Sequence, residues 1–571
     1  MLFHPIRRLK NTKRRIFRTK VDYFWITLDF IPPELPERPR KFFEKLLDLN
    51  KPAPFNVYDL SRDLNYIAQK TNFLGIIIDL RLLTLPSRGF ARFQSMIQIF
   101  NTWKKQYQKE IIVISNSFTT SMYWFASSIA SKGRLFLLPT GSLDTRGLIT
   151  EITYYGETFK KYGIKFEKVA VSGYKSAYDN FARNEVAPEA KENIDWLLDD
   201  FFNQIKQDIR DLRGLSAEQV DNLINNAPWK DQEAKDNGFI DDIVSRDDLP
   251  DILLDKKKKD SILRIQPYQK ALNIVPIRKD PKGKDFIAII GAFGGIIDGK
   301  SRENPSPIPI PFFGREMLGD YTLSQTIRRA LKSSKIKSVV LYIDSPGGSV
   351  TASESIRGAL KKLAKKKHLV VYMGNVAASG GYYIATPAAT IIAQSGTYTG
   401  SIGVLSGNLN LEKALKDQKI NPMEFTRGER AHWGSMNNEM SEEERVSIEK
   451  SIFHSYDWFI DLVHNSRKLD KHKLKTELAG GRVWTGKQAF QHGLVDKVGS
   501  LEDAIESAKL LSKLPLDTPV TILYDQDSHN TFPTTISNPT KSIEDFYNFL
   551  KIFEKKKTYY LSDIPISVKD A

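Results

Sequence analysis

A serine flanked by glycines is the first candidate for chemistry in this chain. Residues 399–403 have the sequence Thr-Gly-Ser-Ile-Gly and follow an apolar run, residues 389–393, that predicts a buried strand. The glycines leave little side-chain bulk around Ser401, and the backbone N–H of Ile402 could face a reacting carbonyl. Glycine–serine turns are common in loops, so this stretch alone is weak evidence for a nucleophile.

Two upstream stretches strengthen the case for an active site. Residues 339–349 have a β-branched strand pattern that runs into a Pro-Gly-Gly turn. Residues 375–385 contain small residues that would let the start of a helix lie close against other backbone. In content, order and separation, the three stretches resemble the serine peptidases of the signal peptide peptidase A (protease IV) family. The resemblance covers roughly residues 50–510 and implies an α/β fold of the crotonase/Clp-protease type.

The chain contains an internal repeat. Four residues recur with identical spacing: Trp229, Ala234, Gly238 and Asp241 match Trp484, Ala489, Gly493 and Asp496. This predicts a tandem duplication of β-α domains, as in the long form of the family. We expect a basic arm and proline-rich spacer at 1–49, a first peptidase-like domain at 50–250, a charged linker at 251–269, a second such domain at 270–525, and a polar tail with an amphipathic helix at 526–571.

The two copies differ in the residues that could do chemistry. Lys175, in the first copy, corresponds to Arg430 in the second. A serine nucleophile needs a base, which a lysine can provide when its pKa is lowered, whereas a guanidinium stays protonated. The second copy also has a Gly-Gly turn at 347–348 that the first copy lacks. The sequence therefore predicts that only the two copies together make a complete site.

The resulting hypothesis is a serine endopeptidase with a Ser-Lys dyad. Ser401 attacks the scissile carbonyl and Lys175 removes its proton, while the backbone N–H groups of Gly348 and Ile402 stabilise the oxyanion. The resemblance also assigns the lysine to the Tyr-Lys-Ser-Ala motif and the serine to the Thr-Gly-Ser-Ile-Gly motif. It implies that the substrates are signal peptide remnants and other unfolded apolar peptides, and that the protein is a homo-oligomer, possibly a tetramer.

Three alternatives stay open at this point. Ser142 aligns with Ser401 in the repeat and could form a dyad with Lys175, although the first copy lacks the Gly-Gly turn. The same fold hosts acyl-CoA enzymes that share the oxyanion site. The chain could also be an inactive scaffold that binds peptides or membranes. His432 and His454 lie outside the family motifs and are interpreted as ordinary polar residues.

Composition limits the remaining functions. A chain of 571 residues suggests several domains, and the absence of cysteine excludes disulfides and thiolate metal sites. The sequence has no metal-ligand cluster and no phosphate loop, so no cofactor is expected. The formal net charge is +16, and residues 1–20 carry eight Lys or Arg without an apolar span. We therefore expect peripheral association with an anionic membrane surface, an otherwise cytoplasmic location, and no nucleic-acid partner.

Overall fold

The computed structural model describes most of the chain. The described residues are 20–36, 55–84, 89–254, 263–275, 283–303, 316–524, 559–561 and 568–570. Parts of three predicted segments lie outside them: the basic arm before residue 20, residues 255–262 of the charged linker, and most of the polar tail at 526–571 with its amphipathic helix.

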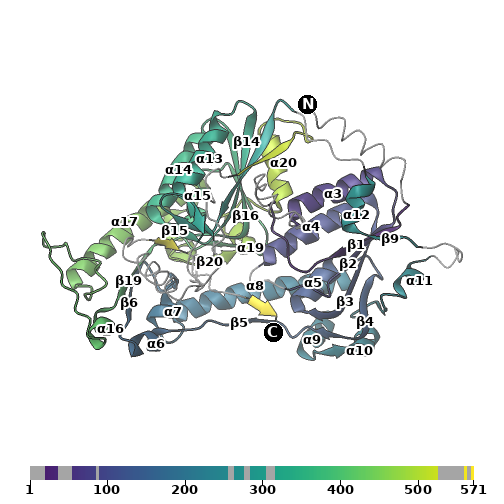
Figure 1. Ribbon diagram of the computed structural model, residues 1–571, viewed down its shortest axis with the longest axis horizontal. Helices are drawn as coiled ribbons and strands as arrows, with labels where there is room; N and C mark the ends of the chain where they lie inside the picture. Colours follow the sequence, from purple (N-terminus) through teal and green to yellow (C-terminus); the bar gives the residue numbers. More distant parts are fainter. Residues whose placement is uncertain are drawn as a thin grey trace. The chain divides into compact units, whose positions relative to one another are not determined.

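The chain forms two compact units that interleave in sequence (Figure 1). Unit 1 comprises residues within 1–150, 198–281 and 568–571, and unit 2 comprises residues within 151–197 and 282–567. Residues 151–197, which belong to the first sequence copy, are therefore part of unit 2. Helix α8 (Pro188–Arg213) begins in unit 2 and ends in unit 1.

Unit 1 is built on a mainly parallel sheet with strand order β7-β4-β3-β2-β1-β9, and β8 also pairs with β4. Its central strand β2 has the sequence Gly-Ile-Ile-Ile-Asp and is buried throughout, as expected for a parallel strand covered on both faces. The strands are β1 (Tyr23–Thr27), β2 (Gly75–Asp79), β3 (Glu110–Thr119), β4 (Leu135–Asp144), β7 (Trp229–Lys230), β8 (Asp242–Ile243) and β9 (Ile265–Pro267). The helices are α3 (Val57–Lys70), α4 (Phe90–Tyr107), α5 (Thr120–Ile129), α9 (Ala217–Asn225), α10 (Asp231–Asp236), α11 (Leu249–Leu253) and α12 (Tyr268–Ile274).

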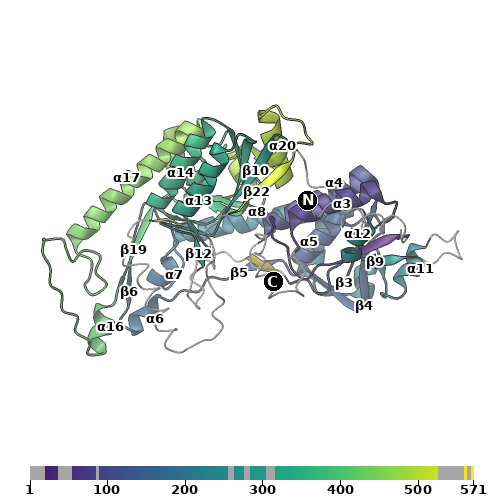
Figure 2. The same cartoon turned by 45° about the horizontal axis from the view of Figure 1, so that its top comes forward.

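Unit 2 contains a similar sheet with order β20-β18-β16-β14-β10-β22, to which β17 and β21 are added. Helices α13 and α14 cover one face and α20 the other (Figures 1 and 2). The strands are β10 (Phe286–Phe293), β14 (Ile336–Ser345), β16 (His368–Ala378), β17 (Thr390–Ala393), β18 (Tyr398–Gly400), β20 (Val483–Thr485), β21 (Lys497–Val498) and β22 (Val520–Leu523). The helices include α13 (Asp320–Lys332), α14 (Val350–Ala364), α15 (Gly380–Ala385), α17 (Glu442–Arg467), α19 (Gly486–Gln491) and α20 (Leu501–Leu511).

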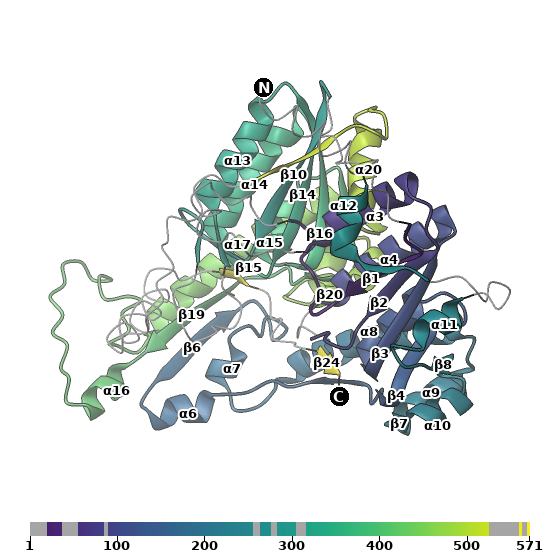
Figure 3. The same ribbon diagram turned by 45° about the vertical axis from the view of Figure 1, so that its right-hand side comes forward.

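A second sheet in unit 2 has the order β12-β13-β11-β15-β23-β19-β6. Figure 3 shows β6 alongside β19, although β6 comes from the first sequence copy and β19 from the second. The strands are β6 (Lys165–Ala170), β11 (Gly295–Ile297), β12 (Arg302–Glu303), β13 (Glu316–Gly319), β15 (Gly347–Ser349), β19 (Leu405–Asn410) and β23 (Tyr559–Leu561). Short helices α6 (Gly156–Lys161), α7 (Asp179–Ala182) and α16 (Glu412–Asp417) also belong to unit 2, while β5 (Leu148–Thr150) pairs with β24 (Val568–Asp570) in unit 1.

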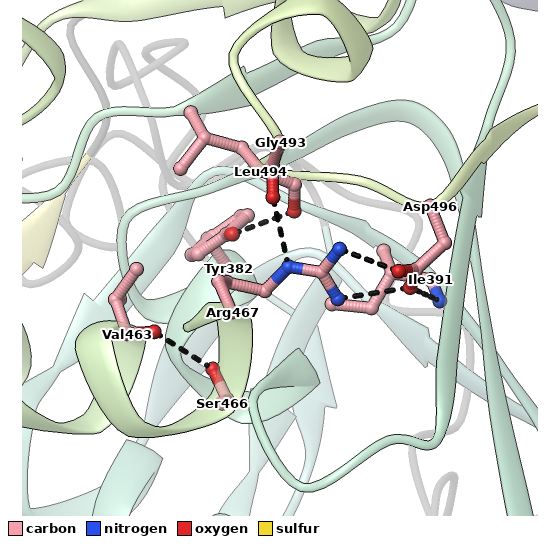
Figure 4. Close-up of polar contacts among 8 residues, drawn as sticks. All are labelled: Tyr382, Ile391, Val463, Ser466, Arg467, Gly493, Leu494 and Asp496. Carbon is pink, nitrogen blue, oxygen red and sulfur yellow. Dashed lines mark hydrogen bonds and ion pairs between the residues drawn. The ribbon is translucent and has the colours of Figure 1, made fainter. Parts of the chain in front are cut away.

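An ion-pair cluster that occurs in both units confirms the predicted duplication, and Figure 4 shows the cluster of unit 2. In unit 2, the Arg467 guanidinium contacts the Asp496 carboxylate at 2.6 Å, and this carboxylate also accepts the backbone N–H of Ile391 at 2.7 Å. The hydroxyl of Tyr382 donates to the carbonyl of Leu494 nearby. Unit 1 repeats these contacts with Arg213, Asp241, Leu135, Tyr123 and Phe239. Each pair ties the end of a long helix to the central sheet.

Strand register corrects one detail of the sequence repeat. In unit 2, Thr399 lies opposite Trp484, and in unit 1 Leu143 lies opposite Trp229. Because the two tryptophans are equivalent, Thr399 corresponds to Leu143, and Ser401 corresponds to Thr145. The alignment of Ser142 with Ser401 is therefore wrong by three residues. The shared Thr-Gly-Ser tripeptide favours that alignment, but the strand pairing shows that the two serines are not equivalent.

Candidate active site

The amine of Lys175 lies at the centre of a buried polar site in unit 2. Its Nζ is 2.8 Å from both the hydroxyl and the carbonyl oxygen of Ser401, and 2.9 Å from the hydroxyl of Ser379. All three side chains are fully buried. The structure thus brings Lys175 of the first sequence copy together with two serines of the second.

Backbone pairing places the Lys175 turn in unit 2. Strand β6 pairs antiparallel with β19, and the N–H of Val171 extends this ladder by donating to the carbonyl of Val404. The turn then packs on Gly481, where an added Cβ would lie 2.8 Å from the Cα of Lys175. Because Gly481 also has a φ of +101°, only glycine suits this position. The lysine is therefore positioned by main-chain contacts on two sides.

Ser379 lies on a strained turn between a strand and a helix. It follows the last residue of β16 and precedes α15, with φ 55° and ψ −113°, which is unusual for a residue other than glycine. Its N–H donates to the carbonyl of Gly400, which fixes the turn to the neighbouring strand β18. The turn holds the Ser379 hydroxyl at the N-terminus of a helix, where the backbone N–H groups lack partners within the helix.

The Gly-Gly turn lies directly against this helix start. An added Cβ on Gly380 would lie 3.1 Å from both the Cα of Gly347 and the N of Gly348, and one on Gly381 would lie 2.6 Å from the carbonyl oxygen of Ser345. The prediction that small residues in 375–385 let a helix start approach other backbone is confirmed. The N–H of Gly348 is consequently close to the residue that follows Ser379.

The backbones of Ser401 and Ile402 contact residues 481–482 rather than the Gly-Gly turn. The N–H of Ser401 donates to the carbonyl of Arg482 at 2.7 Å, and the carbonyl of Ile402 accepts the N–H of Gly481 at 3.0 Å. The side chain of Ile402 is buried in the hydrophobic core of unit 2. Ser401 therefore holds Lys175 through two of its own oxygen atoms, and its backbone is attached to the segment that carries β20.

Ser379 is the functional candidate that the sequence reasoning missed. The small residues of 375–385 predict a close approach of backbone, and that prediction assigns no chemistry to Ser379. The signal was available: a serine stands between a predicted apolar strand and a Gly-Gly pair that begins a helix. A strand–serine–glycine–helix pattern is the kind of sharp turn that presents a nucleophile.

The counterparts of these residues in the other sequence copy differ in chemistry. Thr120 stands in the place of Ser379, and its Oγ1 accepts the N–H of Gly147. Thr145, in the place of Ser401, donates to the carbonyl of Leu223. The counterpart of Lys175 is Arg430, whose side chain is 63% exposed and ion-paired with Glu443. The described residues therefore contain one lysine–serine–serine arrangement of this type.

Comparison with known proteins identifies the class. The model of Peptidase family S49 matches residues 103–259 and 361–515, and the Clp protease model matches residues 322–393. The chloroplastic serine protease SPPA of Arabidopsis thaliana is 33% identical over 413 residues, covering 72% of this chain and 60% of that protein. Protease 4 of Haemophilus influenzae is 29% identical over 511 residues, covering 86% and 79%. A putative signal peptide peptidase SppA of Enterococcus faecium is 35% identical over 204 residues, covering 35% and 59%.

The fold and the matches agree on a tandem α/β peptidase architecture with a Clp-protease-like region. The chain belongs to peptidase family S49.

Proposed function

We propose that this chain is a serine endopeptidase in which Ser379 is the nucleophile and Lys175 the general base. The observation that carries the proposal is the 2.9 Å contact between the Lys175 amine and the Ser379 hydroxyl, beside the Gly348 N–H. Full burial of Lys175 favours the neutral amine over the ammonium ion, and the neutral amine is the form that can accept a proton.

The reaction follows from these positions. The Oγ of Ser379 attacks the peptide carbonyl as its proton moves to the Nζ of Lys175. The N–H groups of Gly348 and Gly380 stabilise the oxyanion, and such a donor contributes about 3 kcal/mol to the transition state. Lys175 then gives the proton to the leaving amine, which departs and leaves the acyl group esterified to the Oγ of Ser379. Water attacks this ester and loses its proton to Lys175; as the ester bond breaks, Lys175 returns the proton to the Oγ of Ser379 and the acid product leaves.

Two observations favour Ser379 over Ser401 as the nucleophile. The residue after Ser379 borders the Gly-Gly turn, so an oxyanion formed at Ser379 has two backbone donors within reach. Ser401 instead contacts Lys175 with both its hydroxyl and its carbonyl, which suits a residue that orients the amine. We therefore assign Ser401 to the positioning of Lys175, and Ile402 no longer needs to act as an oxyanion donor.

The second sheet of unit 2 indicates how a peptide would bind. Strand β23 lies between β15 and β19, with Tyr560 opposite Gly348 and Tyr559 opposite Leu405. The edge that carries the Gly-Gly turn thus accepts an extended segment in antiparallel pairing. We infer that unfolded peptides, including signal peptide remnants, bind as a strand in this position and compete with β23.

This competition gives a prediction for the C-terminal strand. Tyr560→Pro removes a backbone N–H from β23 and weakens its pairing with β15. We expect the KM for a short soluble peptide to fall while kcat stays unchanged. The fall should be about tenfold if β23 leaves the place between β15 and β19 in only about a tenth of the wild-type molecules. Steady-state kinetics would measure the change. Lys569→Pro, which affects β24 instead, is the matched control and should leave KM unchanged; an unaltered KM in Tyr560→Pro would contradict the competition.

The pH dependence of cleavage gives a second prediction. At low pH the Lys175 ammonium cannot accept a proton, so kcat/KM should rise with pH as the amine forms, through a pKa below the value of about 10.4 of an exposed lysine. Tyr174 should not contribute to this rise, because its hydrogen bond to Glu192 raises the pKa of its phenol. A profile that is flat from about pH 6 to about pH 10 would contradict a lysine base.

The expected partners stay predictions. Met423 and Phe425, which follow α16, are 78% and 88% exposed, and clustered exposed apolar side chains are typical of surfaces that bind another protein. The exposure of these two side chains supports the proposal of a homo-oligomer.

Among the helices that the structure describes, none is both long and apolar enough to cross a membrane. Peripheral binding to an anionic membrane rests on the charge of the chain, since the basic arm is outside the described residues.

A further inference from the structure

A column of stacked planar groups lies beside the Lys175 turn in unit 2. The guanidinium carbon of Arg482 is 3.9 Å from the ring centre of Tyr174. The Tyr174 ring stacks on Trp196 at 6.0 Å and 28°, and Trp196 stacks on Trp484 at 4.9 Å and 7°. Such stacking and cation–π contacts stabilise a fixed arrangement of the rings beyond their apolar burial. The column therefore resists movement of Tyr174, the residue directly before Lys175.

Hydrogen bonds fix the middle of the column to strand β20. The indole N–H of Trp196 donates to the carbonyl of Val483 at 2.9 Å. One turn earlier on α8, the Asn193 amide accepts the N–H of Val483 at 2.9 Å and donates to its carbonyl at 3.2 Å. Both polar backbone groups of Val483 are thus engaged by the start of α8. The described residues 188–197 are attached to β20 by side chains as well as by ring stacking.

The same short segment reaches the other side of the site. Val483 pairs with Gly400 in β18, and the carbonyl of Arg482 accepts the N–H of Ser401. Residues 482–484 therefore contact the turn that carries the base and also the residue that holds its amine. A displacement of the column would change the position of the Lys175 amine relative to both serine hydroxyls.

We propose that Tyr174, Trp196 and Arg482 are positioning residues that hold the Lys175 amine against Ser379 and Ser401. This inference rests on the proposed function and adds residues that touch neither the substrate nor the reacting atoms. The dyad combines two sequence copies, so its geometry depends on non-local contacts, and the column supplies them. Catalysis is sensitive to such geometry, because a misplacement of about 1 Å can reduce a rate by about 100-fold.

Comparison of the two copies supports the assignment. Helices α8 and α17 both have 26 residues, and Trp196 in α8 corresponds to Lys450 in α17. Tyr174 corresponds to Glu429, next to Arg430. The second copy, which has arginine in place of the lysine, therefore also has no aromatic ring at the positions of Tyr174 and Trp196.

Trp196→Leu tests the inference in the full-length chain. It removes the stacking and the indole hydrogen bond, so kcat for a soluble peptide should fall about tenfold while KM changes by less than about twofold. The midpoint of the pH–rate rise should move to higher pH, because a loosely held Lys175 is better hydrated and its amine keeps its proton up to a higher pH. Trp196→Phe keeps the ring and should recover most of kcat and the original midpoint. Trp229→Leu, at the counterpart of Trp484 in unit 1, is the control for general loss of a tryptophan and should leave the midpoint unchanged.

The outcomes separate this inference from the proposed function. A lowered kcat with a shifted midpoint, restored by Trp196→Phe, supports the positioning role. Wild-type kinetics in Trp196→Leu, or an equal loss in both Trp196 variants with an unshifted midpoint, would overturn it. If Trp196→Leu does not fold, Arg482→Lys carries the same test, since it keeps the charge but loses the planar contact with Tyr174. If the wild-type chain itself cleaves no peptide, the proposed function fails instead.

Discussion

Ser379→Ala should abolish peptide cleavage, with a loss on the order of 10⁴-fold or more in kcat/KM. The substitution removes the hydroxyl that the structure holds 2.9 Å from the Lys175 amine and next to the Gly-Gly turn. No covalent intermediate can form without it. The loss should be in catalysis and not in folding, because removal of one hydroxyl leaves the turn and its glycine contacts in place.

Ser401→Ala is the matched control for this prediction. It removes one of two contacts that Ser401 makes with Lys175 and keeps the other, which comes from the backbone carbonyl. We therefore expect a smaller loss, about 10- to 100-fold. The two variants should be compared by steady-state kinetics on a soluble peptide, with thermal unfolding to verify the fold. The assignment of the two serines would have to be exchanged if Ser401→Ala were inactive and Ser379→Ala kept substantial activity.

Lys175→Arg should also abolish cleavage, by on the order of 10³-fold or more. The guanidinium stays protonated at any pH at which the protein is folded, so it cannot accept the serine proton. The divergence of the two copies motivates the substitution, since Arg430 stands at the counterpart position. Its side chain is largely exposed there, whereas Lys175 is fully buried.

Burial of a guanidinium could by itself disturb the site, so a second substitution completes this prediction. Lys175→Met has a similar length, carries no charge and cannot act as a base, and it should fold as stably as the wild type while being equally inactive. Activity of both variants should be measured across the pH range used for the wild type. Turnover near the wild-type rate in either variant would remove Lys175 from the mechanism.

The sequence predicted the fold well because its signals are local or repeated. The β-branched run of β2 and the amphipathic pattern of α8 each determine their own element. The Trp-Ala-Gly-Asp repeat predicted the duplication, and its aspartates are the residues that pair with Arg213 and Arg467. The divergence of Lys175 and Arg430 likewise predicted that the base would have to meet a serine of the other copy.

The choice between serines depends on information that the sequence does not contain. Ser401 and Ser379 both follow apolar strands, both neighbour glycine and both have a positive φ, 48° and 55°. Only their contacts with Lys175 and with the Gly-Gly turn distinguish them. The shared Thr-Gly-Ser tripeptide made Ser142 look equivalent to Ser401, while pairing with Trp229 and Trp484 shows a shift. The stacked column could not be predicted from the sequence either, because Trp196 and Trp484 lie far apart in the chain and no local pattern relates them.

Covalent labelling tests the central claim most directly. The wild-type chain would be treated with a fluorophosphonate, digested, and analysed by mass spectrometry to identify the modified serine. The proposed mechanism predicts a phosphonylated Ser379, with labelling that depends on Lys175 and disappears in Lys175→Met. A label on Ser401, or labelling that persists undiminished in Ser379→Ala, would contradict the assignment of Ser379 as the nucleophile.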